Sequence, residues 1–366
     1  MARDRYLKLA EAGLAMPLAP DLVLHEHDNA EAIVNDGEAL GGVITETARR
    51  YRTPLAVPLM DLSVEKRAIA RALGVSPAEA DAFHFDMPPE EQAVRRMLHR
   101  IGATPSLRMQ ATCDAVRCVA RDTSLIPVGM VIGPFSLMTK LLDDPITLTY
   151  LAGTGMPASV IPEVGLYTAV LELASVVVQQ YARMQIDAGA EALVVAEPAP
   201  NTVYISPNQM ATHPAMFDDV VMKYNHRLHM LTAKNDVDLI FHCCGELSDA
   251  MLEKMAELHP AVLSLGSSCK LPEIAHLIPD DVVLYGNLPS KQFYSDGLIT
   301  RDDVLAQGRQ LTAEMAETGH PFILGTECDV LSVPGCRDTI RGKVEAVVEC
   351  SLYSDDEIET RARENA

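Results

Sequence analysis

Histidine and cysteine side chains gather in the run FHCCGE, residues 241–246, which closes the apolar stretch VDLIFHCC. Such a cluster could be a metal site, a catalytic nucleophile, a redox pair or a buried hydrophobic pair. Side chains alternate along a β-strand, so we expect His242 and Cys244 to project to one side and Cys243 to the other. The residues that could bind a metal or react are then His242 and Cys244, while Cys243 faces the core.

A further sulfur, Cys328, stands in the run FILGTECDV at the end of a later apolar stretch. One nitrogen and two sulfurs that converge would match a catalytic zinc site, which has three protein ligands and an open fourth position. A closed structural zinc site would need a fourth ligand and usually a C-x2-C pair, which the sequence lacks. The residues alone therefore leave a catalytic metal site and buried thiols as two open alternatives.

Eight apolar runs, separated by helical patterns, indicate the elements that position these residues. They cover residues 21–26, 53–62, 125–132, 191–197, 237–243, 261–266, 281–287 and 320–326. Continuous rather than alternating apolar runs are typical of strands buried on both faces of a parallel sheet. Strands that alternate with helices predict an α/β fold, and eight of them favour a (β/α)8 TIM barrel. We expect one domain, 1–366, in which the helical segment 63–124 forms an insertion or cap.

Charge and composition exclude several classes of function. The formal net charge of −21 disfavours binding to nucleic acid or to an anionic membrane, which needs clustered Lys and Arg. The opening run MARDRYLKLAEAG lacks the apolar centre of a secretory signal, and no stretch reaches the roughly 18 apolar residues of a membrane helix. We therefore expect a cytoplasmic protein whose 8 cysteines are reduced thiols rather than disulfides.

The active site of a (β/α)8 barrel lies at the C-terminal ends of its strands. Residues with polar side chains, sulfur or a turn-forming backbone follow the predicted strands there: Asp61, Gly133, Pro134, Phe135, Glu197, His242, Cys244, Asn287 and Cys328. Glu197 is expected either to orient a ligand histidine or to cap the following helix. Asp61 is expected either to contact substrate or to cap the helix that starts near Ser63, and the cap is favoured.

Several runs, in the same order, resemble the uroporphyrinogen decarboxylase superfamily. They are VPLMDLSVEKRAIARALG, VIGPFSLMTKLL, VVAEPAPNTVYISPNQMATHPAMFDDVVMKYNHRLH, FHCCGELSDAMLEKMAELHPAVLSLG, VVLYGNLPS and FILGTECDV. The decarboxylases of that superfamily use an arginine-rich N-terminal motif, a Tyr and a late His. This sequence has no Arg-Gln-Ala-Gly-Arg run, Lys140 stands about where the Tyr would be, and Cys328 stands near the place of the His. A uroporphyrinogen decarboxylase-like carboxy-lyase is therefore the alternative.

The branch that the sequence resembles more comprises zinc methyltransferases that work with methylcobamide proteins, such as the coenzyme M methyltransferases of methanogens. Their zinc motif is His-x-Cys with a distant second Cys, and His242, Cys244 and Cys328 match it. The resemblance implies bound Zn²⁺, a methylcobamide carried by a corrinoid-binding partner protein, and a small-molecule methyl acceptor or donor. Transfer could run in either direction, and a barrel that only binds a corrinoid is a further alternative.

The resemblance extends to the surroundings of the metal ligands. Gly133, Pro134 and Phe135 are expected to contact the cofactor, and Asn287, Asp61 and Glu197 to serve the reaction. Cys269 stands near a position at which some members offer an additional zinc ligand, although a buried neutral thiol is favoured here. Asp329 replaces the glycine usual after the last Cys, and an acidic residue there would repel an anionic sulfonate such as coenzyme M. The oligomeric state stays open, with a homodimer as one candidate.

Overall fold

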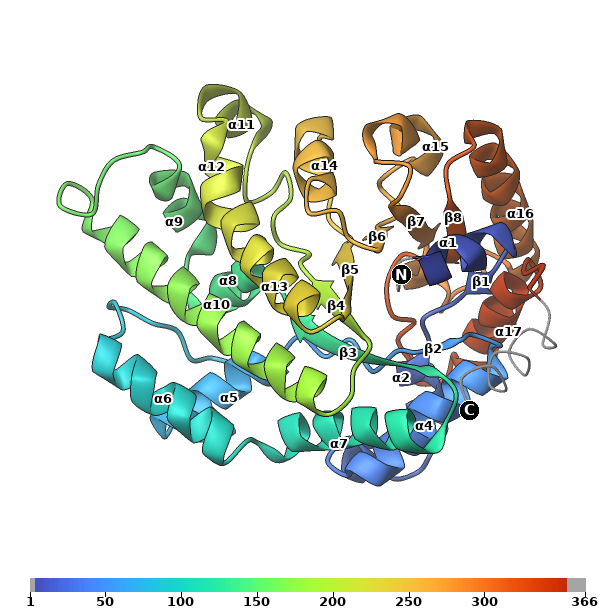
Figure 1. Cartoon of the computed structure of the whole chain (residues 1–366), viewed down its shortest axis with the longest axis horizontal. Coiled ribbons are helices and arrows are strands. Elements are labelled where there is room, and N and C mark those ends of the chain that lie inside the picture. Colours follow the sequence, from blue (N-terminus) through green and yellow to red (C-terminus); the bar gives the residue numbers. More distant parts are fainter. Residues whose placement is uncertain (1–3, 354–366) are drawn as a thin grey trace.

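The computed structural model describes residues 4–353, in which eight parallel strands form a curved sheet surrounded by helices (Figure 1). The strands are β1 (Ala15–Met16), β2 (Leu55–Ala56), β3 (Ile126–Ile132), β4 (Ala192–Ala196), β5 (Asp238–Cys243), β6 (Val262–Leu265), β7 (Val283–Leu288) and β8 (Phe322–Thr326). They pair in the order β1-β8-β7-β6-β5-β4-β3-β2. The predicted (β/α)8 barrel is therefore confirmed, with its seam between β1 and β2.

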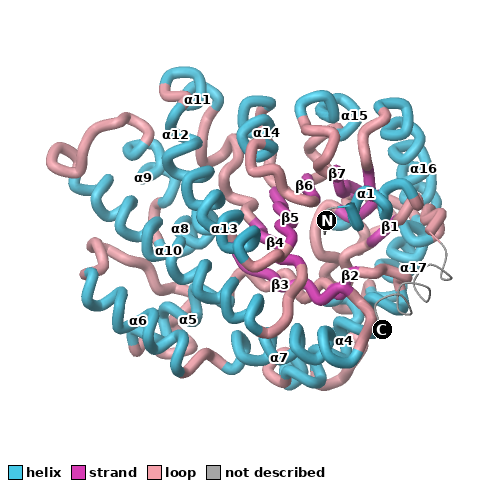
Figure 2. The backbone as a smooth tube through the Cα atoms, in the orientation of Figure 1, coloured by secondary structure: helices cyan, strands magenta, loops and turns pink. Residues whose placement is uncertain are grey.

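Helices form the outer layer around the strands (Figure 2). In the first half of the chain they are α1 (Asp4–Glu11), α2 (Pro20–Leu24), α3 (Ala30–Ile33), α4 (Gly37–Arg50), α5 (Val64–Leu73), α6 (Glu91–Ala103), α7 (Leu107–Asp122), α8 (Pro134–Leu141), α9 (Pro145–Ala152) and α10 (Pro162–Asp187). In the second half they are α11 (Pro207–Thr212), α12 (Ala215–Phe217), η1 (Asp218–Met222), α13 (Lys223–Lys234), α14 (Asp249–Ala256), α15 (Leu271–Ile274), η2 (Ala275–Leu277), η3 (Ser290–Gln292), α16 (Arg301–Thr318) and α17 (Arg337–Val348).

Successive side chains of each strand enter two different cores. In β5, Leu239, Phe241 and Cys243 pack outward against the helices. Ile240, between them, belongs to the cluster inside the barrel, and His242 lines a cavity in the same interior. Both faces of the strand are thus buried, which explains the continuous apolar pattern in the sequence.

Helix α1 closes the N-terminal end of the barrel. Tyr6 is fully buried with the interior cluster. Arg5 bonds to Asp238 at the start of β5 and to Glu191 just before β4, at 3.0 and 2.7 Å. Among residues 4–353, α1 covers the end at which the strands begin, and the side chains that follow the strands lie at the opposite end.

The structure corrects the N-terminal strand assignments. Residues 21–26, predicted as a strand, contain most of helix α2, which begins with Pro20 at its first position. Proline fixes the backbone angle that starts a helix, and the first strand is instead the two-residue β1. The run 53–62 contributes only the two residues of β2.

Residues 63–124, between β2 and β3, hold helices α5, α6 and α7. Helix α7 packs on α4 and on β3, and α5 packs on α6 and α8. The interpretation of this segment as an insertion or cap stays a prediction. No helix between residues 4 and 353 combines the length and the apolar composition needed to cross a bilayer.

Candidate metal centre

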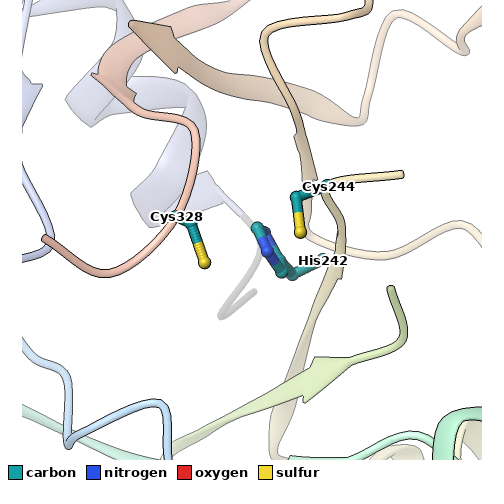
Figure 3. Close-up of side chains that lie close together, drawn as sticks. All are labelled: His242, Cys244 and Cys328. Carbon is teal, nitrogen blue, oxygen red and sulfur yellow. The ribbon is translucent and has the colours of Figure 1, made fainter. Parts of the chain in front are cut away.

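Three candidate metal ligands meet at the C-terminal end of the barrel (Figure 3). His242 lies near the end of β5, Cys244 follows that strand directly, and Cys328 follows β8. One ligand atom from each lies within 4.8 Å of the other two. The structure thus brings together the three residues that the sequence singled out, from strands that are not neighbours.

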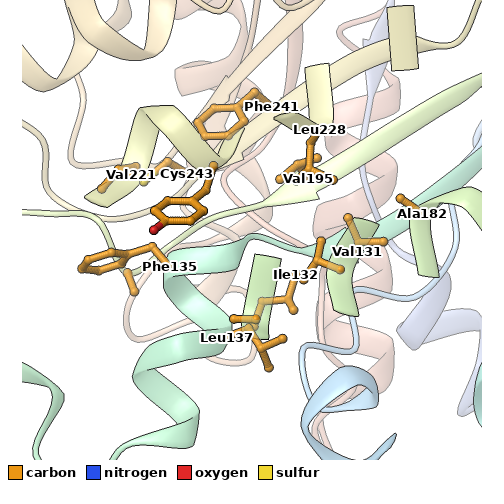
Figure 4. Close-up of a cluster of buried hydrophobic side chains, with 14 of the residues drawn as sticks. Val131, Ile132, Phe135, Leu137, Ala182, Val195, Val221, Leu228, Phe241 and Cys243 are labelled. Carbon is orange, nitrogen blue, oxygen red and sulfur yellow. The ribbon is translucent and has the colours of Figure 1, made fainter. Parts of the chain in front are cut away.

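Cys243 lies apart from this group, as strand alternation predicted. Its side chain is fully buried among Phe241, Val195 and Val221 on the helix-facing side of the sheet (Figure 4). Burial raises the pKa of the Cys243 thiol. Cys243 is therefore a neutral core residue, although it is adjacent to Cys244 in the chain.

His242 offers one ring nitrogen to the centre. Its Nδ1 lies 2.8 Å from Oγ of Ser264 on the neighbouring strand β6. The Nε2 atom is buried and has no hydrogen-bond partner. A neutral ring whose Nδ1–H donates to Ser264 leaves the Nε2 lone pair free, and a metal ion would satisfy it.

The two sulfurs behave as a coupled pair. A hydrogen bond from the Cys328 thiol lowers the pKa of Cys244, and the same contact raises the pKa of Cys328. A metal ion binds cysteine as thiolate, so its binding would displace the thiol protons of both residues. An unpartnered nitrogen and two sulfurs form a donor set that suits zinc.

Lys291 brings positive charge to the same end of the barrel. Burial alone would lower its pKa, but Cys244, Glu327 and Cys328 attract the ammonium, and the net pKa is raised. Its Nζ lies 3.6 Å from Glu327, whose Oε2 also accepts a 2.7 Å hydrogen bond from Ser267. Glu327 is thus held by partners within the chain and is not part of the ligand group.

Glu197 caps a helix rather than orienting the histidine. Its two oxygens each accept a backbone N–H, one from Phe135 and one from Ser136, both at 2.9 Å, at the start of α8. The prediction that it orients His242 is therefore wrong, because Ser264 holds that ring. The helix that it caps lies earlier in the chain, so the predicted cap of the following helix is wrong as well. Burial raises the pKa of Glu197.

The segment Gly133–Phe135 packs on this carboxylate. A Cβ on Gly133 would lie 2.1 Å from the Glu197 carboxyl group, so only glycine fits there. Pro134 and Phe135 are buried, and the Phe135 ring packs edge to face on Tyr204, with 6.1 Å between the ring centroids. The segment therefore has a packing role, and its contact with a cofactor stays a prediction.

Asn287 holds the loop that follows β6. Its Nδ2 donates to the carbonyl groups of Gly266 and Cys269, at 2.8 and 2.6 Å. A Cβ on Gly266 would lie 2.8 Å from Cα of Cys244, so this loop packs directly against the ligand backbone. Asn287 thus supports Cys244 indirectly. Cys269 is buried, and burial raises its pKa; it does not join the ligand group.

Asp61 lies two residues before Ser63, which is the N-cap residue of α5 and has no side-chain cap bond. Its Oδ1 accepts hydrogen bonds from the amide and hydroxyl of Ser63, at 3.1 and 2.6 Å. Its Oδ2 lies 3.3 Å from Nε of Arg108 on α7. These bonds fix the turn before the helix and satisfy no amide of its first turn, so Asp61 is not the cap. A contact between Asp61 and substrate stays a prediction.

A groove of about 1160 Å³ lies between helices α2 and α3 on one side and α5 and the start of α7 on the other, and it reaches Asp329, the residue after Cys328. Met60, Asp61 and Asp329 contribute to its lining. Burial, together with the nearby Asp21, raises the pKa of Asp329 to about 7. Met60 also lines the cavity inside the barrel, beside His242 and Ser264. Residues of this groove and of the interior cavity therefore meet at Met60.

Sequence reasoning missed two residues of this region. Ser264 is the single polar residue of strand β6 and faces inward, opposite His242. A serine inside the apolar run 261–266 was the sequence signal that could have identified it. Met60 offered no such signal, because a methionine in an apolar run is ordinarily predicted to be a core residue.

Comparisons with known proteins agree with the fold. A solved structure described as a methyltransferase from Methanosarcina mazei superposes with a TM-score of 0.64 at 16% sequence identity, covering 95% of this chain and 98% of that one. No curated protein matches the chain. The family model described as uroporphyrinogen decarboxylase (URO-D) matches residues 31–349. The match spans most of the sequence, so the chain belongs to the uroporphyrinogen decarboxylase family.

Proposed function

We propose that the protein is a zinc-dependent methyltransferase that moves a methyl group between a methylcobamide, carried by a corrinoid-binding partner protein, and a thiol or similar small molecule. The observation that carries the proposal is the convergence of His242, Cys244 and Cys328, whose ligand atoms lie within 4.8 Å of one another. The likeness in fold to a methyltransferase supports it. The direction of transfer is left open.

His242 would hold the metal ion through Nε2, and Cys244 and Cys328 through their sulfurs. The ion, when bound, would lower the pKa of a ligated substrate thiol so that it reacts as thiolate at neutral pH. Two thiolates and a neutral imidazole cancel the charge of Zn²⁺, which leaves a substrate thiolate electron-rich. That set of ligands suits a centre that activates a nucleophile.

The surrounding residues position the ligands. Ser264 fixes the ring of His242, so that Nε2 points at the two sulfurs. Asn287 holds the loop on which the Cys244 backbone rests. Lys291 contributes positive charge beside both thiolates, which stabilises their ionised form. These contacts hold the ligand side chains in place before the substrate binds, as a preorganised centre requires.

Charged side chains of both signs line the groove through which a methyl acceptor or donor would approach. Asp329 directly follows Cys328, lines the groove and is only 7% exposed. Asp61 adds a second carboxylate to the groove wall. Arg67, Arg71 and Arg108 line the same groove, and burial raises the pKa of Asp329 to about 7. The groove therefore carries both signs of charge, and its lining selects neither an anionic nor a cationic substrate.

The proposal requires reduced thiols, as the cytoplasm maintains. All eight cysteines of the chain are free. We therefore place the reaction in the cytoplasm, with the partner's corrinoid presented at the C-terminal end of the barrel. That end carries the metal ligands and is the end that α1 leaves open.

Zinc analysis and a methyl-transfer assay together test the proposal. Freshly purified protein should contain one zinc per chain and should demethylate methylcobalamin with at least one member of a panel of anionic, neutral and cationic thiols. Cys328→Ala should lose both properties. Cys336→Ala, which alters a cysteine outside the ligand group, should keep both. Protein free of zinc would contradict the proposal and would favour the carboxy-lyase alternative. Methyl transfer that survives Cys328→Ala would show that the proposed ligand set is wrong.

A further inference from the structure

Met60 places a third sulfur beside the candidate metal centre. Its Sδ lies 3.5 Å from Sγ of Cys328. Its backbone N–H donates to Oδ2 of Asp329, the next residue after Cys328, at 3.1 Å. Main chain and side chain of Met60 are therefore both attached to the segment that carries the ligand.

The fourth position of the centre has no other donor of the usual kinds. Between residues 4 and 353, the group of His, Cys, Asp and Glu ligand atoms that could share an ion has three members and no fourth. Glu327 is bound by Ser267 and Lys291, and Cys269 lies outside the group. A soft thioether is a chemically suitable neighbour for two thiolates.

The Cys328 thiol donates a hydrogen bond to the Met60 sulfur, and a shared ion would keep the two sulfurs at a similar separation. Two sulfurs bound to tetrahedral zinc at about 2.3 Å lie roughly 3.8 Å apart. The 3.5 Å between Met60 and Cys328 is close to this value. Met60 also lines the interior cavity together with His242, so its side chain borders the cavity on which another ligand lies.

We infer that the Met60 thioether fills the fourth position of the metal centre at rest, and that a substrate sulfur arriving along the groove takes its place. This rests on the zinc site of the proposed function. A thioether is a neutral, weak donor, so a thiolate can displace it. The exchange changes no oxidation state: the thioether leaves with its electron pair, and the substrate thiol gives its proton to solvent. Met60 lines both cavities, which places it at the point of exchange.

Zinc X-ray absorption of selenomethionine-substituted protein tests the resting ligand directly. All 17 methionines become selenium-labelled, but only a bound one scatters at ligand distance from the zinc. We expect one selenium neighbour per zinc in the unmodified protein and none in Met60→Leu. Met130→Leu, a buried methionine of the barrel interior, should keep the selenium signal. Leucine has nearly the volume of methionine, so both variants should fold.

Zinc without a selenium neighbour in the unmodified protein would overturn the inference and leave the proposed function standing. Protein that binds no zinc at all would overturn both. A cobalt-substituted sample gives a second measurement, since its visible spectrum reports sulfur ligation. Titration with 2-mercaptoethanol should show at least several-fold tighter binding to Met60→Leu, because no thioether competes. Equal affinity in the two proteins would contradict displacement.

Discussion

His242 and Ser264 stand opposite each other in the register of β5 and β6, with Nδ1 of the imidazole 2.8 Å from the serine oxygen. The contact leaves Nε2 as the buried nitrogen that faces the sulfurs. A single hydroxyl on a neighbouring strand thereby selects which nitrogen of the ring is offered to a metal.

Ser264→Ala should weaken zinc binding without removing a ligand. Loss of such an orienting partner typically costs about 10- to 100-fold in metal affinity, because the ring loses its fixed direction. Competition with a chromophoric chelator would measure the change. Ser268→Ala, whose hydroxyl bonds instead to the carbonyl of Gly245, is the matched control. Unchanged affinity in Ser264→Ala would show that the serine does not orient the ligand.

The adjacent cysteines should give opposite results on mutation. Cys244→Ala should abolish stoichiometric zinc, because it removes a ligand. Cys243→Ala should retain zinc but lower the free energy of unfolding by about 1–2 kcal/mol, since it opens a small void in the core. Metal analysis and denaturant unfolding of the metal-free proteins separate the two effects. Loss of zinc from Cys243→Ala would refute the alternation on which both assignments depend.

Two glycines should respond to alanine with opposite signs. At Gly133 the new Cβ would lie 2.1 Å from the Glu197 carboxyl group, so the cap of α8 must shift and the protein should lose several kcal/mol of stability. At Gly42, in helix α4, nothing lies within 4 Å of the new Cβ. Gly42→Ala should therefore stabilise by about 0.5–1 kcal/mol. Thermal unfolding would measure both changes. Unchanged stability in Gly133→Ala would show that the Glu197 carboxylate does not have to occupy its present position.

Glu65 should make stability depend on pH. Its Oε1 accepts the amide of Ile132, its Oε2 has no partner, and burial raises its pKa to about 8. The folded state then binds the proton more tightly than the unfolded state. Its contribution is complete below the unfolded pKa near 4.5 and is lost as the pH rises to about 8.

Glu65→Gln keeps the acceptor and cannot ionise, so it lacks this dependence. Between about pH 5 and pH 8 the variant should become more stable relative to the unmodified protein, by a free energy of unfolding on the order of a few kcal/mol. Above that range the melting temperatures of the two proteins should change with pH in parallel. Thermal melts across that range are sufficient. Parallel curves throughout would mean that Glu65 ionises as freely in the folded protein as in the unfolded chain.

The metal ligands could be predicted from the sequence because they depend on local rules. Strand alternation separates Cys243 from Cys244, and the convergence of strand ends in a barrel brings Cys328 to His242. Neither rule needs atomic detail. Both outcomes are present in the structure.

Other features depend on pairings that no local pattern encodes. Glu197 caps α8 because the strand ends place its carboxylate under the amides of Phe135 and Ser136. The run 21–26 looks like a strand from composition, yet Pro20 starts a helix there and the true strand β1 has two residues. Strands so short carry almost no periodic signal, so they are recognised only from their partners in the sheet.

The ligands stand on β5 and β8, with β6 and β7 between them in the sheet. An ion shared by Cys244 and Cys328 would act as a cross-link that closes the intervening chain into a ring. In the chain-entropy model, closing a ring of this order of length restricts the unfolded chain by about 4–5 kcal/mol. The centre proposed for catalysis would therefore also stabilise the fold, and removal of the ion would lower the free energy of unfolding of the whole barrel.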